Sequence, residues 1–209
     1  MVINGNTAGT VSFSGKNIFW QGNSISARYS DGQTPCGYYL SNTVSAQLSS
    51  GAKILLMQDY SKDGWRIDDN IADWPTYIKP RIRGGDIVVN FEIYNYLKLN
   101  TVASTWAQYL TYINLIKAAG AKFVFCTAIG NHNLAVRADY DTDRLTFNQM
   151  VRDNAGTYGY AVCDLGAVTH LATQADADDT TYYGDPTHPK KAGLDLMLTP
   201  LYNAITSFL

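Results

Sequence analysis

The strongest constraint on the fold is the alternation of short apolar runs with amphipathic blocks. Five runs are continuously apolar, at residues 17–22, 52–58, 86–93, 121–129 and 160–165. Helical spacing lies between them, as with Leu40, Val44 and Leu48. Strands buried on both faces show continuous runs, and strand–helix alternation is typical of parallel sheets. We therefore predict a three-layer α/β/α sandwich with a five-stranded, mostly parallel, flavodoxin-like sheet.

The length of the chain agrees with a single domain. Its 209 residues, 46% of them hydrophobic, can bury a core without disulfides. We expect this domain to span residues 17–209. Residues 1–16, rich in Gly, Ser and Thr, are expected to be an N-terminal extension, a linker or an edge strand. Further helices are expected at 68–79, 143–155 and 189–209, the last interrupted at Pro200.

Composition and charge argue against several function classes. A net charge of −2 without a basic tract argues against nucleic-acid binding, which needs clustered Lys and Arg. No apolar run approaches the roughly 20 residues of a membrane span. No signal peptide is evident at the start, so the localisation stays open, with an extracellular or surface location favoured. We expect neither metal nor cofactor, and we expect the cysteines (Cys36, Cys126 and Cys163) to be bystanders.

Polar residues follow the predicted strands. Ser24 comes after the first strand in the turn Gly-Asn-Ser-Ile, Gly64 after the second and Asn95 after the third, while Asp185 and His188 stand just before the last helix. The carboxyl ends of parallel strands meet at one edge of a sheet, so these residues are expected to converge. A serine, a histidine, an acid and amide donors are the groups that acyl transfer needs.

These four segments, in this order, resemble the motif blocks of SGNH hydrolases, the GDSL-type esterases and lipases. The resemblance spans about residues 17–208 and is most specific in the block from Asp185 to His188. It implies that Ser24 is the nucleophile, that His188 is the general base and that Asp185 orients His188. It further implies an oxyanion hole made of the N–H groups of Ser24 and Gly64 and the side-chain amide of Asn95.

The chain departs from the family pattern in two blocks. Asn23 stands where an Asp is usual, and Ile93 and Tyr96 replace the Gly and Asp that flank the third-block Asn. Other residues are alternatives for single roles: Asn90 and Asn100 for the amide donor, and His132 and His170 for the base. Each of these residues, taken alone, also has a purely structural explanation. Ser24 suits a turn, Gly64 suits an unusual backbone angle, and Asn95 suits the end of a strand.

Two further groups of residues call for interpretation. Glu92 places a carboxyl group in a central strand, so we expect it to face the cleft or to pair with Arg66. Aromatic residues flank the predicted site and are expected to form a rim that binds substrate: Trp65, Tyr94, Tyr96 and Tyr183.

Together these residues predict a metal-free serine esterase that hydrolyses small acyl esters through an acyl-enzyme. The neutral polar composition and the aromatic residues favour O-acetyl groups on a carbohydrate, so the expected partner is a small acyl ester or an acetylated glycan. Two alternatives stay open. One is a non-catalytic glycan-binding or attachment domain of a surface or virion protein, and the other is an acyl transferase on the same fold. The oligomeric state is left open.

Overall fold

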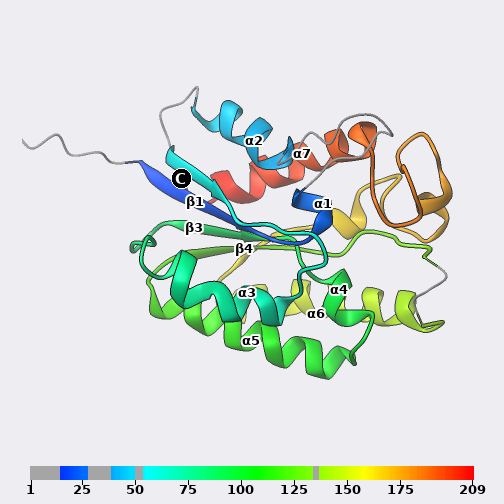
Figure 1. Cartoon of the computed structure of the whole chain (residues 1–209), viewed down its shortest axis with the longest axis horizontal. Coiled ribbons are helices and arrows are strands. Elements are labelled where there is room, and N and C mark those ends of the chain that lie inside the picture. The colour runs from blue at the N-terminus through cyan, green and yellow to red at the C-terminus, as the bar shows by residue number, and fades with distance from the viewer. Residues whose placement is uncertain (1–14, 28–38, 50–53, 134–136) are drawn as a thin grey trace, which may run out of the picture.

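A computed structural model describes residues 15–27, 39–49, 54–133 and 137–209. Its centre is one five-stranded sheet in the order β2-β1-β3-β4-β5, and every neighbouring pair is parallel (Figure 1). The strands are β1 (Lys16–Gln21), β2 (Ile54–Asp59), β3 (Ile87–Asn90), β4 (Lys122–Cys126) and β5 (Ala161–Cys163). This sheet and its flavodoxin-like order confirm the predicted fold class.

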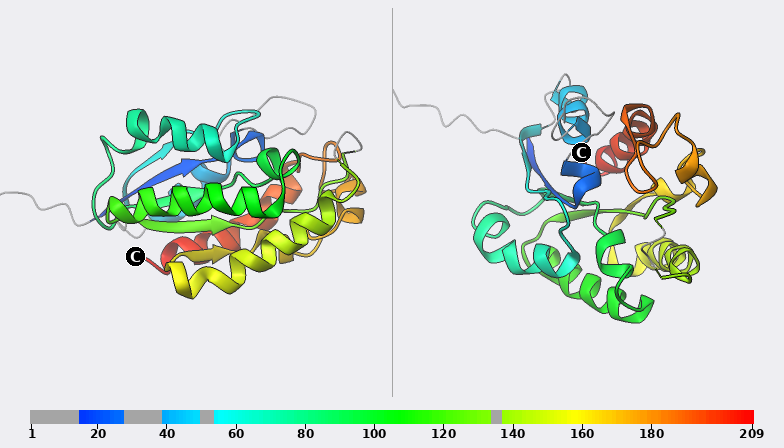
Figure 2. Two further views of the ribbon diagram at one scale, coloured as in Figure 1. Left: turned by 90° about the horizontal axis from the view of Figure 1, so that it is seen from below. Right: turned by 45° about the vertical axis from the view of Figure 1, so that its right-hand side comes forward.

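Helices cover both faces of the sheet. One face carries the short α1 (Ser24–Ala27), α2 (Tyr39–Ser49) and α7 (Lys191–Thr206) (Figure 1). The other carries α3 (Ile67–Asp73) with the π-turn η1 (Trp74–Ile78), α4 (Tyr94–Leu97), α5 (Val102–Ala118) and α6 (Tyr140–Tyr158) (Figure 2). Two 3₁₀ turns, η2 (Leu165–Ala167) and η3 (Ala175–Asp178), lie in the connection from β5 to α7. None of the described helices is long and apolar enough to cross a membrane.

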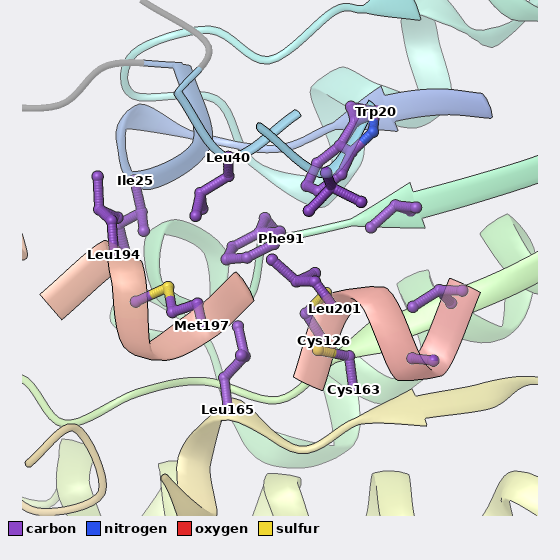
Figure 3. Packing of buried hydrophobic residues seen from close by; sticks show 14 of the residues in the cluster. Trp20, Ile25, Leu40, Phe91, Cys126, Cys163, Leu165, Leu194, Met197 and Leu201 are labelled. Atoms are coloured by element: carbon purple, nitrogen blue, oxygen red, sulfur yellow. The ribbon is translucent and has the colours of Figure 1, made fainter. Parts of the chain in front are cut away.

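Successive strand side chains point to opposite faces and build two hydrophobic cores. In β1, Ile18 and Trp20 pack toward α2 and α7, whereas Phe19 packs toward α5. Figure 3 shows the first core, in which Met197 and Leu201 of α7 reach toward Phe91 and the two buried cysteines. Cys126 and Cys163 are free and buried there as small apolar side chains. Burial on both faces explains why the strand sequences are continuously apolar.

Local structure differs from the sequence predictions in two places. The expected interruption of the last helix is wrong, because α7 runs through Pro200 without a break. Met197 and Leu201 are fully buried around it, so packing against the sheet offsets the hydrogen bond that proline cannot make. The helix expected at 68–79 divides into α3 and the π-turn η1, where Pro75 removes a donor. Residues 1–14 of the expected extension lie outside the described residues.

The direction of the strand order reverses between β1 and β3. Both strands end side by side, since Gln21 of β1 is in register with Asn90 of β3. The connections that leave these strands go to opposite faces and open a crevice at their carboxyl ends, the usual ligand position in such sheets. Ser24 and Asn95 lie on these two connections.

Candidate active site

The turn after β1 places Ser24 at the first position of α1. Gly22 makes this turn possible, because a Cβ there would lie 2.3 Å from Ser26 Oγ and 2.8 Å from Phe91 Cβ. The Asn23 side chain accepts a hydrogen bond of 3.0 Å from the Ile25 backbone N–H. A neutral Asn therefore supplies the local support that the first block needs, without the negative charge of the Asp that is usual there.

Three predicted residues form one hydrogen-bonded chain. Ser24 Oγ lies 2.8 Å from His188 Nε2, although 164 residues separate the two in sequence. On the other side of the ring, His188 Nδ1 lies 2.9 Å from Asp185 Oδ2 and 3.0 Å from Oδ1. The carboxylate selects the tautomer with a proton on Nδ1, which leaves Nε2 as the acceptor that faces the serine. This arrangement can withdraw a proton from Ser24.

Asp185 is held as a carboxylate by its own loop. Partial burial opposes ionisation, but hydrogen bonds from the His188 ring and from the backbone N–H groups of Thr187 and His188 outweigh it. Both backbone bonds measure 2.8 Å and end on Oδ1. The pKa of Asp185 therefore lies below its ordinary value. A tight turn thus both fixes the acid and keeps it charged beside the imidazole.

The amide of Asn95 is oriented at both ends. Its Nδ2 donates to the backbone carbonyl of Trp65 at 3.0 Å, and its Oδ1 accepts from Lys98 Nζ at 3.0 Å. Because the oxygen accepts from a cation and the nitrogen donates to a carbonyl, the orientation of the Asn95 amide is determined. The second proton on Nδ2 is available for an oxyanion, and the lysine charge makes that proton a better donor.

Neither competing asparagine takes the place of Asn95. The Asn90 Nδ2 has no hydrogen-bond partner among the described residues, but it is fully buried. Asn90 is buried in β3, where its Oδ1 accepts from Tyr109 Oη at 3.0 Å and from the Glu92 backbone N–H at 3.0 Å. The Asn100 amide donates to the Tyr96 carbonyl at 2.9 Å, at the far end of α4. Lys98 was missed by sequence reasoning, although its spacing of three residues from Asn95 on a helix is a usable signal.

Gly64 lies in the loop that Asn95 contacts. Its backbone has φ of +74°, a conformation that disfavours other residues, and a Cβ there would meet no atom within 4 Å. The glycine is thus required by backbone shape rather than by crowding. The same loop is hydrogen-bonded to the turn that carries Ser24, because the Lys62 N–H donates to the Gly22 carbonyl at 3.1 Å. Gly64 is exposed on this loop, between the two ties.

Glu92, the only glutamate in the sequence, is fully buried behind the site. Its Oε1 accepts a hydrogen bond of 3.1 Å from the Tyr96 backbone N–H. Burial raises the pKa of Glu92 to about 8, and the backbone N–H groups of Tyr96, Asn95 and Ile67 oppose that rise. Both halves of the expectation are wrong: Glu92 does not face the cleft, and Arg66 pairs with Asp68 and Asp69 instead. The carboxyl group lies between the starts of α3 and α4.

A small apolar cavity of about 20 Å³ lies between the nucleophile turn and the connection after β3. Ile25 and Tyr94, the neighbours of Ser24 and Asn95, form part of its wall, with Phe91, Ile93 and Ile129. A cavity of this size holds roughly one water-sized group, such as a methyl group. It can therefore take the short apolar end of an acyl group bound at Ser24.

A larger hollow of about 460 Å³, called the polar hollow here because most of its lining residues are polar, lies beside His188 and Asp185. It is lined by His188, Asp185, Pro186, Thr187, Asn133 and a second pair, His132 with Asp178. His132 Nδ1 lies 2.7 Å from Asp178 Oδ2 and 2.8 Å from Oδ1. Sequence reasoning found no acid for His132, since Asp178 is 46 residues away and nothing in the local pattern marks it.

Neither alternative histidine takes the place of His188. Within the part of the chain that the structure describes, Ser24 Oγ has a hydrogen bond to His188 and to no other imidazole. His132 lies on the rim, as sequence reasoning favoured. His170 is exposed and stacks on Tyr182, with ring centroids 4.4 Å apart.

The expected aromatic rim is mostly absent. Tyr183 is 2% exposed and donates to the Gly130 carbonyl at 3.1 Å, and Tyr96 is 8% exposed in the second core, so neither offers a free ring face. Tyr94 is also buried, with its ring edge-on to Tyr140 at 5.4 Å, and it lines the apolar cavity. Trp65 alone is partly exposed, beneath Lys62 Nζ at 3.8 Å from the ring centroid. The three tyrosine rings are buried rather than exposed because packing in the core removes their large apolar surface from water.

No protein-family model matches the sequence, and no curated protein matches it. Solved structures do match the fold. A GDSL-like lipase from Bacteroides thetaiotaomicron gives a TM-score of 0.69 at 15% identity, covering 93% of this chain and 89% of that one. A member of the lipolytic protein G-D-S-L family from Veillonella parvula gives 0.71 at 15% identity, covering 91% and 98%. A catalytic mutant of Axe2, an acetylxylan esterase from Geobacillus stearothermophilus, gives 0.69 at 14% identity, covering 93% and 95%. The chain therefore has the fold of GDSL-type hydrolases over nearly its whole length, as the resemblance implied.

Proposed function

We propose that the protein is a serine esterase of the SGNH hydrolase type that cleaves small acyl esters through an acyl-enzyme. One observation carries the proposal: the hydrogen-bonded chain from Ser24 Oγ through His188 to Asp185 at the reversal point of the sheet. A serine hydroxyl is a poor nucleophile until a positioned base accepts its proton. Here the base, its tautomer and its orienting acid come together at hydrogen-bond distance.

The proposed reaction has two halves. His188 accepts the proton of Ser24 Oγ as this oxygen attacks the ester carbonyl, and the developing oxyanion is met by the N–H groups of Ser24 and Gly64 and by the Asn95 amide. The alcohol then leaves with the proton from His188, and the acyl group stays on Ser24. A water molecule that gives its proton to His188 releases the acid and restores Ser24.

Two features support an acetyl ester of a carbohydrate as the substrate class. The apolar cavity beside Ser24 has room for about one methyl-sized group. The hollow beside His188 and Asp185 is lined mostly by polar residues and is large enough for a sugar ring. Axe2, which shares the fold, is described as an acetylxylan esterase.

The test is hydrolysis of 4-nitrophenyl acetate together with labelling by a fluorophosphonate. The purified chain should hydrolyse the ester and carry the label on the peptide that contains Ser24. Ser24→Ala should abolish both, whereas Ser49→Ala, an exposed serine at the end of α2, should change neither.

Absence of turnover and of labelling in the wild-type chain would contradict the proposal. Retained binding of an acetylated glycan in that case would favour the glycan-binding alternative. Transfer of acetate to an added sugar in preference to water would favour the acyl transferase.

A further inference from the structure

The second His–Asp pair, His132 with Asp178, has no role in the reaction proposed above. It shares the polar hollow with His188 and Asp185. Its side chains are 40% and 54% exposed, and an exposed contact of this kind adds little to the stability of the fold, since even exposed ion pairs contribute only about 0–1 kcal/mol. A binding role explains the pair better than a structural role does.

The chemistry of the second pair is set by Asp178. The carboxylate accepts a hydrogen bond from the Nδ1–H of His132, so Nε2 of the neutral ring is a hydrogen-bond acceptor. Nε2 has no hydrogen-bond partner among the residues that the structure describes. A substrate hydroxyl group is the complementary donor.

The position of the pair is set by the catalytic loop. The His132 backbone N–H donates to the Pro186 carbonyl at 2.9 Å, and Asn133 Nδ2 lies 3.4 Å from Thr187 Oγ1. The segment that carries His132 is therefore tied to the loop between Asp185 and His188. His132 is held at a fixed place beside the catalytic ring.

The reaction decides which half of the substrate meets this wall. His188 returns its proton to the alcohol oxygen, so the alcohol half of the ester has to lie on the His188 side of Ser24. The acyl half has a separate apolar cavity, which Ile25 and Tyr94 help to line. The polar hollow is thus the place for the alcohol.

We propose that His132, oriented by Asp178, binds the alcohol half of the ester by accepting a hydrogen bond at Nε2 from a hydroxyl group close to the ester. His132 is then a specificity-determining residue and Asp178 a positioning residue. The ligand class is a partly acetylated sugar that keeps a free hydroxyl. This inference rests on the proposed function and deepens it.

The experiment compares two acetates with the same ring size. The first is the monoacetate of methyl β-xylopyranoside, which keeps two hydroxyl groups, and the second is cyclohexyl acetate, which has none. The wild-type chain should show a higher kcat/KM on the sugar acetate. His132→Phe keeps a flat ring but removes the acceptor. It should lower kcat/KM on the sugar acetate about tenfold, mainly through KM, and should lower it much less on cyclohexyl acetate.

Two further variants keep the test interpretable. His132→Gln retains an acceptor and should recover part of the loss, and Asp178→Asn should reproduce part of it, since an amide holds the ring less firmly. His170→Phe removes an exposed histidine that does not line the hollow and should match the wild type. Thermal unfolding of each variant checks that it folds.

Equal losses on both substrates, or no loss on the sugar acetate, would overturn the role of His132. Equal wild-type rates on both acetates would also overturn it. A wild-type chain that cleaves neither acetate nor 4-nitrophenyl acetate would instead refute the esterase proposal itself, so the two failures are distinguishable.

Discussion

Two His–Asp pairs lie on one polar hollow and have nearly the same internal geometry. In each pair the carboxylate contacts Nδ1 of the ring, at 2.9 Å for His188 with Asp185 and at 2.7 Å for His132 with Asp178. The side chains are also similarly exposed, 31% and 53% against 40% and 54%. Neither the pairing distance nor solvent access distinguishes them.

The group at Nε2 makes the difference. His188 Nε2 lies 2.8 Å from Ser24 Oγ, whereas His132, which also lines the hollow, has no hydrogen-bond partner at Nε2 among the described residues. An oriented imidazole is a proton acceptor in both places, but it does chemistry only where a nucleophile stands in reach and amide donors face the product of attack. Under the proposed mechanism, therefore, a His–Asp pair by itself does not define a catalytic site.

The largest expected difference between the pairs lies in their acids. Asp185→Asn should lower kcat on 4-nitrophenyl acetate by about 10³–10⁴-fold, because an amide stabilises the wrong tautomer and gives no charge to the imidazolium. Asp178→Asn should cost about tenfold or less, and only in kcat/KM for sugar esters. Steady-state kinetics of both variants on both substrate types is the measurement. Comparable losses from the two variants would contradict the division of roles.

The next effect concerns the donors that only the first pair has. Asn95→Ala should lower kcat by about 10²–10³-fold with little change in KM, since it removes a hydrogen bond that forms in the transition state. Asn100→Ala is the matched control, because its amide bonds to the Tyr96 carbonyl outside the site. Similar rates for the Asn95 variant and the wild type would leave the first pair without its proposed oxyanion donor.

A third acid, Glu92, contrasts with both paired aspartates, because it is buried and has no basic ion-pair partner among the described residues. Its folded-state pKa of about 8 exceeds its ordinary value of 4.5. Between these values the unfolded chain loses the proton while the folded chain keeps it, so the stability that Glu92 contributes is fully present below pH 4.5 and is lost as the pH rises toward 8. Glu92→Gln should remove this part of the slope, an effect of a few kcal/mol.

Urea unfolding at pH 5 and pH 8 is the check for Glu92. Part of the slope should persist in Glu92→Gln, because burial also raises the pKa of Asp59. An unchanged pH slope in the variant would show that the buried carboxyl does not titrate as stated.

The smallest expected effect concerns the apolar cavity that is proposed to hold the acyl group. Ile129→Ala enlarges the apolar cavity and should raise the ratio of 4-nitrophenyl butyrate to acetate hydrolysis several-fold, at a cost of about 2–5 kcal/mol in stability. Ile116→Ala removes an equally buried side chain from α5, remote from the cavity, and should destabilise without changing the ratio. An unchanged ratio in Ile129→Ala would separate the cavity from acyl selection.

The layered fold and three candidate site residues, Ser24, Asp185 and His188, could be predicted from the sequence. Continuous apolar runs set the buried strands, and helical spacing set the covering layers. Ser24, Asp185 and His188 were recognisable because Ser24 follows a strand, Asp185 and His188 precede the last helix, and both segments resemble motif blocks of SGNH hydrolases. Asp185 and His188 are three residues apart on one turn, so their contact is a local property of the chain.

Other contacts in the site could not be predicted, because they join residues that no local sequence pattern links. Asp178 contacts His132 because the connection from β5 to α7 passes next to it. Glu92 is buried between the N-termini of α3 and α4, two helices that follow different strands. Tyr96 and Tyr183 are buried and do not join the expected rim, since burying an aromatic ring lowers the free energy of the folded chain more than leaving it in water does. Local periodicity encodes the elements, whereas the surroundings of a side chain depend on which elements the sheet brings together.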